Sequence, residues 1–187
     1  MSSHPLLYGA ASNSRAAFLA FIVAGTTFAV AAIPAPDTAS GWLAAALAGL
    51  FYAPLAINAL IDVHAHVLLK NWTHLAGAVC FGALWIGPYP LRSIAAAIAF
   101  AIFFVPVAKL SRGNLLGMGD ARLLVVLAGW NGLWSEQGPL TMVAVAFGAH
   151  TLFVLGKSLF AKVTLHSRHP LGPWLVGGSW LAWALVA

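Results

Sequence analysis

Long runs of apolar residues, separated by short polar breaks, dominate the pattern of this 187-residue chain. A helix needs about 20 apolar residues to cross the roughly 30 Å hydrocarbon core of a membrane. Runs close to that length predict seven spans, at residues 16–33, 41–61, 73–88, 92–110, 120–135, 139–159 and 172–187. The breaks carry turn formers such as Pro34, Pro88, Gly113 and Gly138, and none of them is long enough for a soluble domain.

The composition strengthens the prediction of an integral membrane protein. Apolar residues make up 61% of the chain and charged residues only 7%, far from the balance of a soluble domain. Helices are expected because a bilayer offers backbone polar groups no other partner, and the sequence lacks the alternation of a membrane barrel. We predict an all-α, polytopic membrane helix bundle of about seven spans, with an N-terminal segment carrying one span (residues 1–40) and a six-helix core (residues 41–187).

The first span has a second interpretation. A basic residue, an apolar stretch and small residues near AIPAPDTAS are also features of a cleaved signal peptide. The apolar stretch is longer than the usual signal core of roughly 7 to 15 residues, which favours a retained helix. Cleavage would leave the orientation of the other six spans unchanged.

The basic residues predict the orientation of the bundle. If alternate breaks lie on opposite sides, the side of the N-terminus carries Arg15, Lys70, Lys109, Arg112, Arg122, Lys157, Lys162 and Arg168, and the other side carries only Arg92. Cytoplasmic loops are enriched in Lys and Arg, so the N-terminus is expected in the cytoplasm and the C-terminus outside. Because these residues are scattered singly between apolar runs, nucleic acid is not expected as a partner.

Two of the four acidic residues lie where a carboxylate is costly. Asp37 and Glu136 fall in short outer breaks, whereas Asp62 and Asp120 lie at the cytoplasmic edges of two predicted helices, in FYAPLAINALID and DARLLVVLAGW. An ionisable group at a membrane boundary usually faces protein or a water-filled cavity, which makes it a functional candidate. The alternative is that each aspartate caps a helix or pairs with a base such as Arg122.

Two carboxylates that meet across water suit aspartic peptide hydrolysis. Because like charges repel, one pKa rises and the pair holds one proton between them. The ionised group takes a proton from a water that attacks the peptide carbonyl, while the protonated group donates to the carbonyl oxygen. Gly117 and Gly119, just before Asp120, lack Cβ atoms and let a substrate or a neighbouring helix approach closely.

Three stretches resemble the type IV prepilin peptidases, which are membrane aspartyl proteases with a GxGD motif. GNLLGMGDARLL resembles the family's second-aspartate motif, INALIDVHAHVLLKNWTHLAG its first-aspartate segment, and HPLGPWLVGG the proline-glycine-proline motif that opens its last helix. The resemblance covers roughly residues 41 to 187. It implies that Asp62 and Asp120 are the catalytic pair of an aspartic endopeptidase, a hydrolase, with a site shaped by Gly117, Gly119, Pro170, Gly172 and Pro173.

The resemblance also implies a substrate and a location. The substrate is a prepilin or pseudopilin with a hydrophobic helix, cut after its short leader at the cytoplasmic face of the bacterial plasma membrane. The protein would then serve type IV pilus assembly or protein secretion, without cofactor or metal. The chain has no room for the cysteine-containing domain that accompanies N-methylation in larger members, so a short-form peptidase is expected.

The sequence departs from the family at two positions. The Leu-Pro pair that usually follows the first aspartate is absent from VLLKN, and Arg122 stands where a lysine is common, which keeps the charge but changes the geometry. Asn58 lies one turn before Asp62 on the same helix face. We expect Asn58 either to bond near the site or to bond a neighbouring helix.

Other functions stay open for the same residues. Asp62 and Asp120 would also suit a proton- or cation-coupled transport or binding protein, although the acids lie at one edge and the sequence shows no repeat. A peptidase-like protein that only assists pilus assembly would keep both aspartates. The run DVHAH suggests a metal site of Asp62, His64 and His66, but hydrolases of that kind need a barrel that this chain cannot build.

Overall fold

The computed structural model describes residues 18, 22–27, 39–160 and 170–185, in which all regular structure is helical. Residues 22–27 are helical, and six further helices are α2 (Ala39–Ala65), α3 (Lys70–Ala83), α4 (Pro90–Leu110), α5 (Met118–Trp134), α6 (Gly138–Phe160) and α7 (Gly172–Ala184). The predicted all-α class is confirmed for these residues. Most of the first predicted span lies outside the described residues. The same is true of Arg15, Asp37, Lys162 and Arg168.

Three of the described helices are long and apolar enough to cross a membrane, namely Gly41–Ala65, Pro90–Leu110 and Gly138–Leu159. In α4 and α6 only 11% and 22% of the most apolar stretch is buried within the molecule, as expected of helices that face lipid. The three helices indicate a membrane protein. Because α3, α5 and α7 have only 14, 17 and 13 residues, the structure supports three of the seven predicted spans by length and composition.

The bounds of α2 and α3 differ from the prediction. α2 continues past Asp62 to Ala65, and α3 already begins at Lys70, so that residues 66–69 alone connect them. α3 ends at Ala83 rather than at residue 88. Turn hydrogen bonds to the residue three positions earlier continue from Leu84 to Ile86, and Gly87, which precedes Pro88, disfavours the helical conformation. The short connection after α2 brings the start of α3 close to Asp62.

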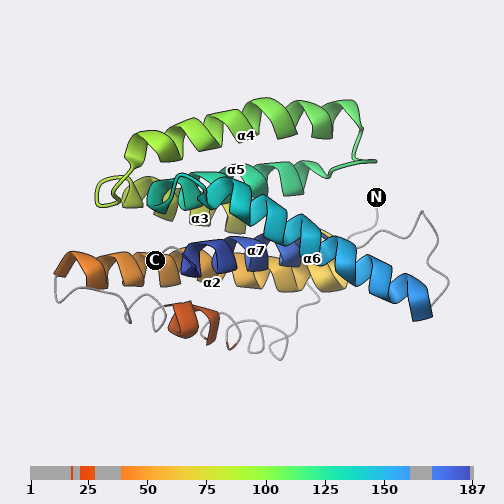
Figure 1. Ribbon diagram of the computed structural model, residues 1–187, viewed down its shortest axis with the longest axis horizontal. Coiled ribbons are helices and arrows are strands. Elements are labelled where there is room, and N and C mark those ends of the chain that lie inside the picture. Colours follow the sequence, from red (N-terminus) through yellow and green to blue (C-terminus); the bar gives the residue numbers. More distant parts are fainter. Residues whose placement is uncertain (1–17, 19–21, 28–38, 161–169, 186–187) are drawn as a thin grey trace.

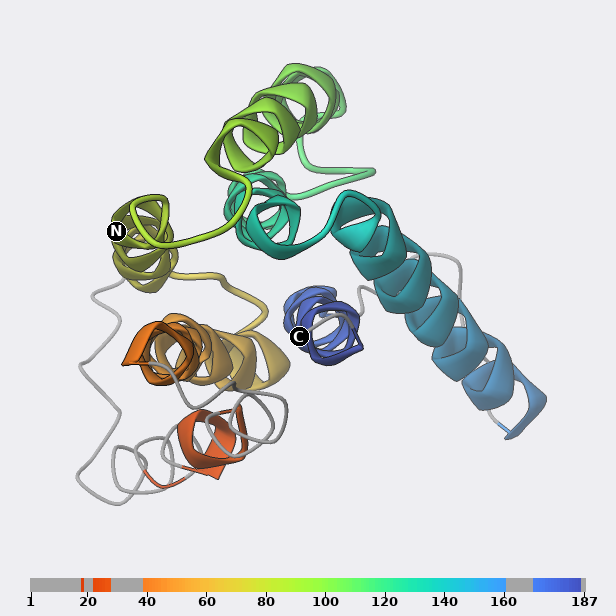
Figure 2. The same cartoon turned by 60° about the vertical axis from the view of Figure 1, so that its left-hand side comes forward.

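The helices alternate in direction along the bundle (Figure 1). The ends of α2, α4 and α6 therefore lie at the same end of the molecule, on the right in Figure 1, as the starts of α3, α5 and α7. α5 lies centrally, in contact with α3, α4, α6 and α7. α6 packs against α5 and α7, and its far end extends away from the bundle (Figure 2). The alternation brings Asp62, in the last turn of α2, and Asp120, in the first turn of α5, to one end of the bundle.

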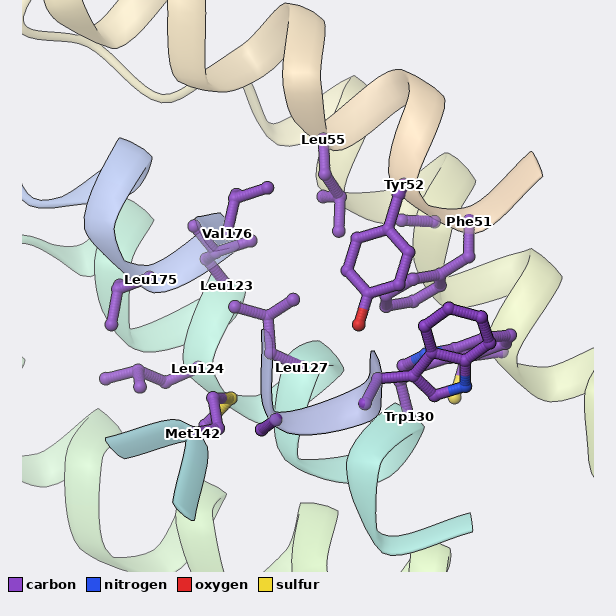
Figure 3. Packing of buried hydrophobic residues seen from close by; sticks show 14 of the residues in the cluster. Phe51, Tyr52, Leu55, Leu123, Leu124, Leu127, Trp130, Met142, Leu175 and Val176 are labelled. Atoms are coloured by element: carbon purple, nitrogen blue, oxygen red, sulfur yellow. The ribbon is translucent and has the colours of Figure 1, made fainter. Parts of the chain in front are cut away.

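Packed apolar and aromatic side chains join α2, α5 and α7 in the core (Figure 3), and a polar network also links the three helices. The ring of Phe51 stacks on that of Trp130 with 4.2 Å between centroids. The Tyr52 hydroxyl donates to the carbonyl oxygen of Ser179 at 3.0 Å, and Asn131 Nδ2 donates to Ser179 Oγ at 2.7 Å. Apolar burial does not drive helix association in lipid, so close packing and such hydrogen bonds fix the positions of these helices.

Candidate active site

The carboxylate of Asp62 is turned into the protein. The residue is 5% exposed, and its Oδ2 accepts a 3.0 Å hydrogen bond from the backbone N–H of Gly172, the first residue of α7. The first N–H groups of a helix have no partner within the helix and carry partial positive charge. The start of α7 therefore supplies a backbone donor that holds Asp62 in place.

The carboxylate of Asp120 folds back over the start of its own helix. Gly117 is the N-cap of α5, and its backbone forms a hydrogen bond with the Asp120 side chain. This is the acidic half of a capping box, in which the third residue of a helix reaches back to the N-cap. A Cβ added to Gly117 would lie 2.8 Å from Asp120 Oδ2, so the carboxylate keeps this position only over a glycine.

The two carboxylates interact with each other. Asp120 lies outside the three apolar spans, and its pKa is raised to about 6, chiefly by burial and then by the negative charge of Asp62. The hydrogen bond from Gly117 opposes this rise. Because a carboxyl group with a raised pKa keeps its proton in mildly acidic water, the pair is suited to hold one proton.

Glycines leave the space in which the carboxylates and one leucine pack. A Cβ added to Gly172 would lie 2.7 Å from Asp62 Oδ2 and 2.9 Å from Leu68 Cδ2. A Cβ on Gly119 would lie 3.0 Å from the Cβ of Leu68. Together with Gly117, the glycines predicted to shape the site therefore lie directly against it.

The prolines of the third motif flank Gly172 at the start of α7. Pro170 precedes the helix and Pro173 lies in its first turn, where a missing N–H removes no helical hydrogen bond. Pro173 also lines a largely apolar cavity of about 380 Å³, together with α2 and α7 residues that include Val63 and Trp180. The cavity reaches the residues next to Asp62 and Gly172.

Asn58 is fully buried and bonds the connection between α2 and α3. Its Oδ1 accepts a 2.8 Å hydrogen bond from the N–H of Leu69, and its Nδ2 donates to the Leu69 carbonyl at 3.3 Å and to Thr73 Oγ1 at 3.2 Å. These contacts correspond to the expected bonding of a neighbouring helix. They also act near the site, because Leu68 is the residue before Leu69.

Arg122 is exposed on α5. In the part of the chain that the structure describes, the salt bridge found joins Arg92 to Glu136, with 3.5 Å between the nitrogen and the oxygen, beyond the other end of α5. The structure thus places Arg122 near Asp120 in sequence but gives its side chain no ion pair within those residues.

His66 directly follows α2, beside the first carboxylate. Its backbone N–H donates to the carbonyl oxygen of Asp62 at 2.9 Å, and its ring interacts electrostatically with the Asp62 side chain. Its φ of 52° is uncommon for a residue other than glycine. Over the described ranges, three or more His, Cys, Asp or Glu side chains nowhere gather closely enough to hold a metal ion.

Leu68 is the site residue that the sequence did not single out. It lies in VLLKN beside Leu69, an identical residue whose side chain is 42% exposed. Both leucines follow α2 directly and precede α3, so no local pattern distinguishes them. Only the positions of α5 and α7 show that Leu68 packs at the site.

Comparison of the chain with known protein families, with curated proteins and with solved structures found no match. The chemistry of this site is therefore inferred from its own residues and from the motifs that they form.

Proposed function

We propose that this protein is a membrane aspartyl endopeptidase that removes the leader from a prepilin or prepilin-like protein. The observation that carries the proposal is the convergence of Asp62 and Asp120 at one end of the bundle, each bonded to the backbone at the start of a helix. Gly117 and Gly172 leave the space that the two side chains occupy. Two interacting carboxylates with backbone hydrogen-bond donors are suited to aspartic peptide hydrolysis.

The reaction needs one water and the shared proton. The ionised carboxylate takes a proton from the water as its oxygen bonds to the peptide carbonyl carbon, and the protonated carboxyl gives its proton to the carbonyl oxygen. When the carbon–nitrogen bond breaks, the leaving amine takes a proton from one carboxyl, and a hydroxyl of the diol returns its proton to the other carboxylate as the carbonyl re-forms in the new carboxyl terminus. The pair then holds one proton again, because the two protons it gave, to the carbonyl oxygen and to the amine, are balanced by those it received from the water and from the diol.

An apolar substrate segment is supported by the surroundings of the pair. The cavity that includes Val63, Pro173 and Trp180 is mostly apolar and lies beside the turn that carries Asp62. A hydrophobic helix entering laterally would find apolar walls there, while its first residues must unwind to expose a peptide bond to water. Lys70 and Lys109 lie at the same end of the bundle as the carboxylates, which favours a cytoplasmic position for the site.

Co-expression with a tagged prepilin and a tagged pseudopilin from the same genome tests the proposal. Loss of the leader is followed by gel shift and N-terminal sequencing for the wild type and for Asp62→Asn, Asp120→Asn and Glu136→Gln. We expect the wild type and Glu136→Gln to cleave at the leader junction. We expect both aspartate variants to be inactive while inserted and as abundant as the wild type, because each amide is nearly isosteric but cannot exchange the proton.

Two results would count against the peptidase. Cleavage by both aspartate variants at the wild-type rate would remove the catalytic assignment. If the wild type leaves every tested pilin intact, a transport protein or an assembly partner explains the two carboxylates better.

A further inference from the structure

The side chain of Leu68 fills the space between the starts of α5 and α7. A Cβ added to Gly172 would lie 2.9 Å from Leu68 Cδ2 and 2.7 Å from Asp62 Oδ2. On the other side, Leu68 Cβ lies 3.0 Å from the position of a Cβ on Gly119, the residue before Asp120. One aliphatic side chain therefore borders both Gly172, whose N–H bonds Asp62, and Gly119, the residue before Asp120.

Asn58 holds the backbone beside Leu68. Its carboxamide pairs with both the N–H and the carbonyl of Leu69 and also reaches Thr73 Oγ1. Asn58 is fully buried, so these bonds have no competing water, and a buried amide that lost them would be left unsatisfied. The connection is also short, since α2 ends at Ala65 and α3 begins at Lys70. Leu68 is consequently held against the glycines and has little freedom to swing away.

From this packing we infer that Leu68 is a specificity-determining residue that limits the size of the substrate side chain next to the cleaved bond, and that Asn58 is its positioning residue. The inference rests on the proposed peptidase function, since the size limit acts on a peptide bond brought to Asp62 and Asp120. A substrate that places its carbonyl at the carboxylates must bring a flanking side chain to the volume that Leu68 borders. Replacing the isobutyl group of Leu68 with a methyl group opens that volume to a larger substrate side chain.

The chain offers a matched control in the next residue. Leu69 is the same residue type in the same connection, but its side chain is 42% exposed and only its backbone bonds Asn58. Leu69→Ala removes the same number of carbon atoms while leaving both backbone bonds in place. Any general effect of shortening a leucine in this connection therefore acts in both variants.

The experiment measures kcat/KM of the full-length protein in lipid bilayers on a panel of prepilin reporters. The reporters carry Gly, Ala, Val or Leu on each side of the cleaved bond in turn. We expect Leu68→Ala to raise the efficiency on the larger side chains, relative to the smallest, by about 10-fold or more, because a pocket distinguishes substrates by about that factor for each carbon atom. We expect Leu69→Ala to keep the wild-type preference and Asn58→Ala to widen it in the same direction as Leu68→Ala.

The outcomes separate this inference from the peptidase itself. Cleavage by Leu68→Ala with an unchanged size preference overturns the inference and leaves the peptidase standing. Failure of the wild type on every reporter overturns both. If Leu68→Ala does not insert, Leu68→Val replaces it, and an unchanged preference in that variant overturns the inference in the same way.

Discussion

The two ends of α5 each have a carboxylate nearby, in opposite surroundings. Asp120, in the first turn, is partly buried and bonds the backbone of Gly117, and the negative charge of Asp62 raises its pKa. Glu136, just beyond the last turn, has a side chain that is 78% exposed and forms a 3.5 Å salt bridge with Arg92. A carboxylate surrounded by water and a base is stable as an anion, whereas a buried one beside another acid is not. Burial and the type of partner, rather than acidity alone, therefore mark the candidate site.

Closely packed glycines also occur at both ends, with different neighbours. At the site, a Cβ on Gly172 would meet the side-chain atoms of Asp62 and Leu68. At the other end, a Cβ on Gly132 would meet α4, at 3.2 Å from the carbonyl oxygen of Arg92 and 3.3 Å from the Cα of Ser93. Side-chain ends can move at small cost, but a helix backbone cannot. A methyl group should therefore disturb chemistry at the first end and stability at the second.

Among variants that keep both carboxylates, the largest effect is expected from Gly172→Ala. The added methyl carbon would lie only 2.7 Å from Asp62 Oδ2, so we expect the carboxylate to turn away while the helices stay packed. We expect kcat/KM for prepilin cleavage to fall about 100-fold or more, because a displacement of about 1 Å can cost that much. The measurement is the cleavage rate normalised to the amount of inserted protein.

Gly132→Ala is the control for this variant. Because α4 must shift, we expect a loss of about 1–3 kcal/mol of stability. Turnover per folded molecule should stay within about twofold of the wild type, since distant sites act independently. The comparison fails if Gly132→Ala reduces turnover as strongly as Gly172→Ala.

A smaller effect is expected in the pH dependence of stability. The pKa of Asp120 is about 6 in the folded protein, against an ordinary value of 3.8, so the folded state binds more protons than the unfolded state between these values. The stabilising contribution is therefore complete below about pH 4 and is lost as the pH rises through about 6. We expect Asp120→Asn to lack this loss, which is at most about 3 kcal/mol for the shift from 3.8 to about 6 and smaller because solvent screens a partly exposed carboxyl group, measured by thermal unfolding in detergent across that range.

Glu136→Gln removes a carboxylate from the opposite end and is the control. It should keep the decline between about pH 4 and 6 that Asp120 causes. A flat profile for Glu136→Gln, or an unchanged decline for Asp120→Asn, would assign the effect to another group.

The smallest effect is expected from breaking the exposed salt bridge. Arg92→Gln removes the partner of Glu136, and the guanidinium also lies 4.2 Å from the centroid of the Tyr89 ring. Exposed pairs contribute little because water screens them, so the stability should change by less than about 1 kcal/mol. Prepilin cleavage should not change. A larger change in thermal unfolding or any loss of cleavage would show that this end is more than a solvated surface.

The helices and the aspartate pair follow from the sequence because both depend on local rules. Each apolar run closes its hydrogen bonds within its own segment, which is why the six described runs from residue 41 onward are helical close to their predicted bounds. An aspartate at a helix edge in an apolar chain is unusual by position alone. Asp62 and Asp120 could therefore be selected before any fold was known, together with Gly117 and Gly119 beside Asp120, whereas Gly172 was implied only by the resemblance of its motif.

The contacts between these residues were decided by tertiary structure alone. Spacing along one helix gives no information about which backbone N–H approaches Asp62 from α7 or which side chain fills the gap beside Gly119. Leu68 and Leu69 are chemically identical, yet one packs at the site and the other is 42% exposed. Asn58 bonds the backbone of Leu69 across the connection, and the preceding side chain packs against Gly119 and Gly172. Which of the two leucines packs at the site depends on atoms that are distant in sequence and meet only when the helices pack.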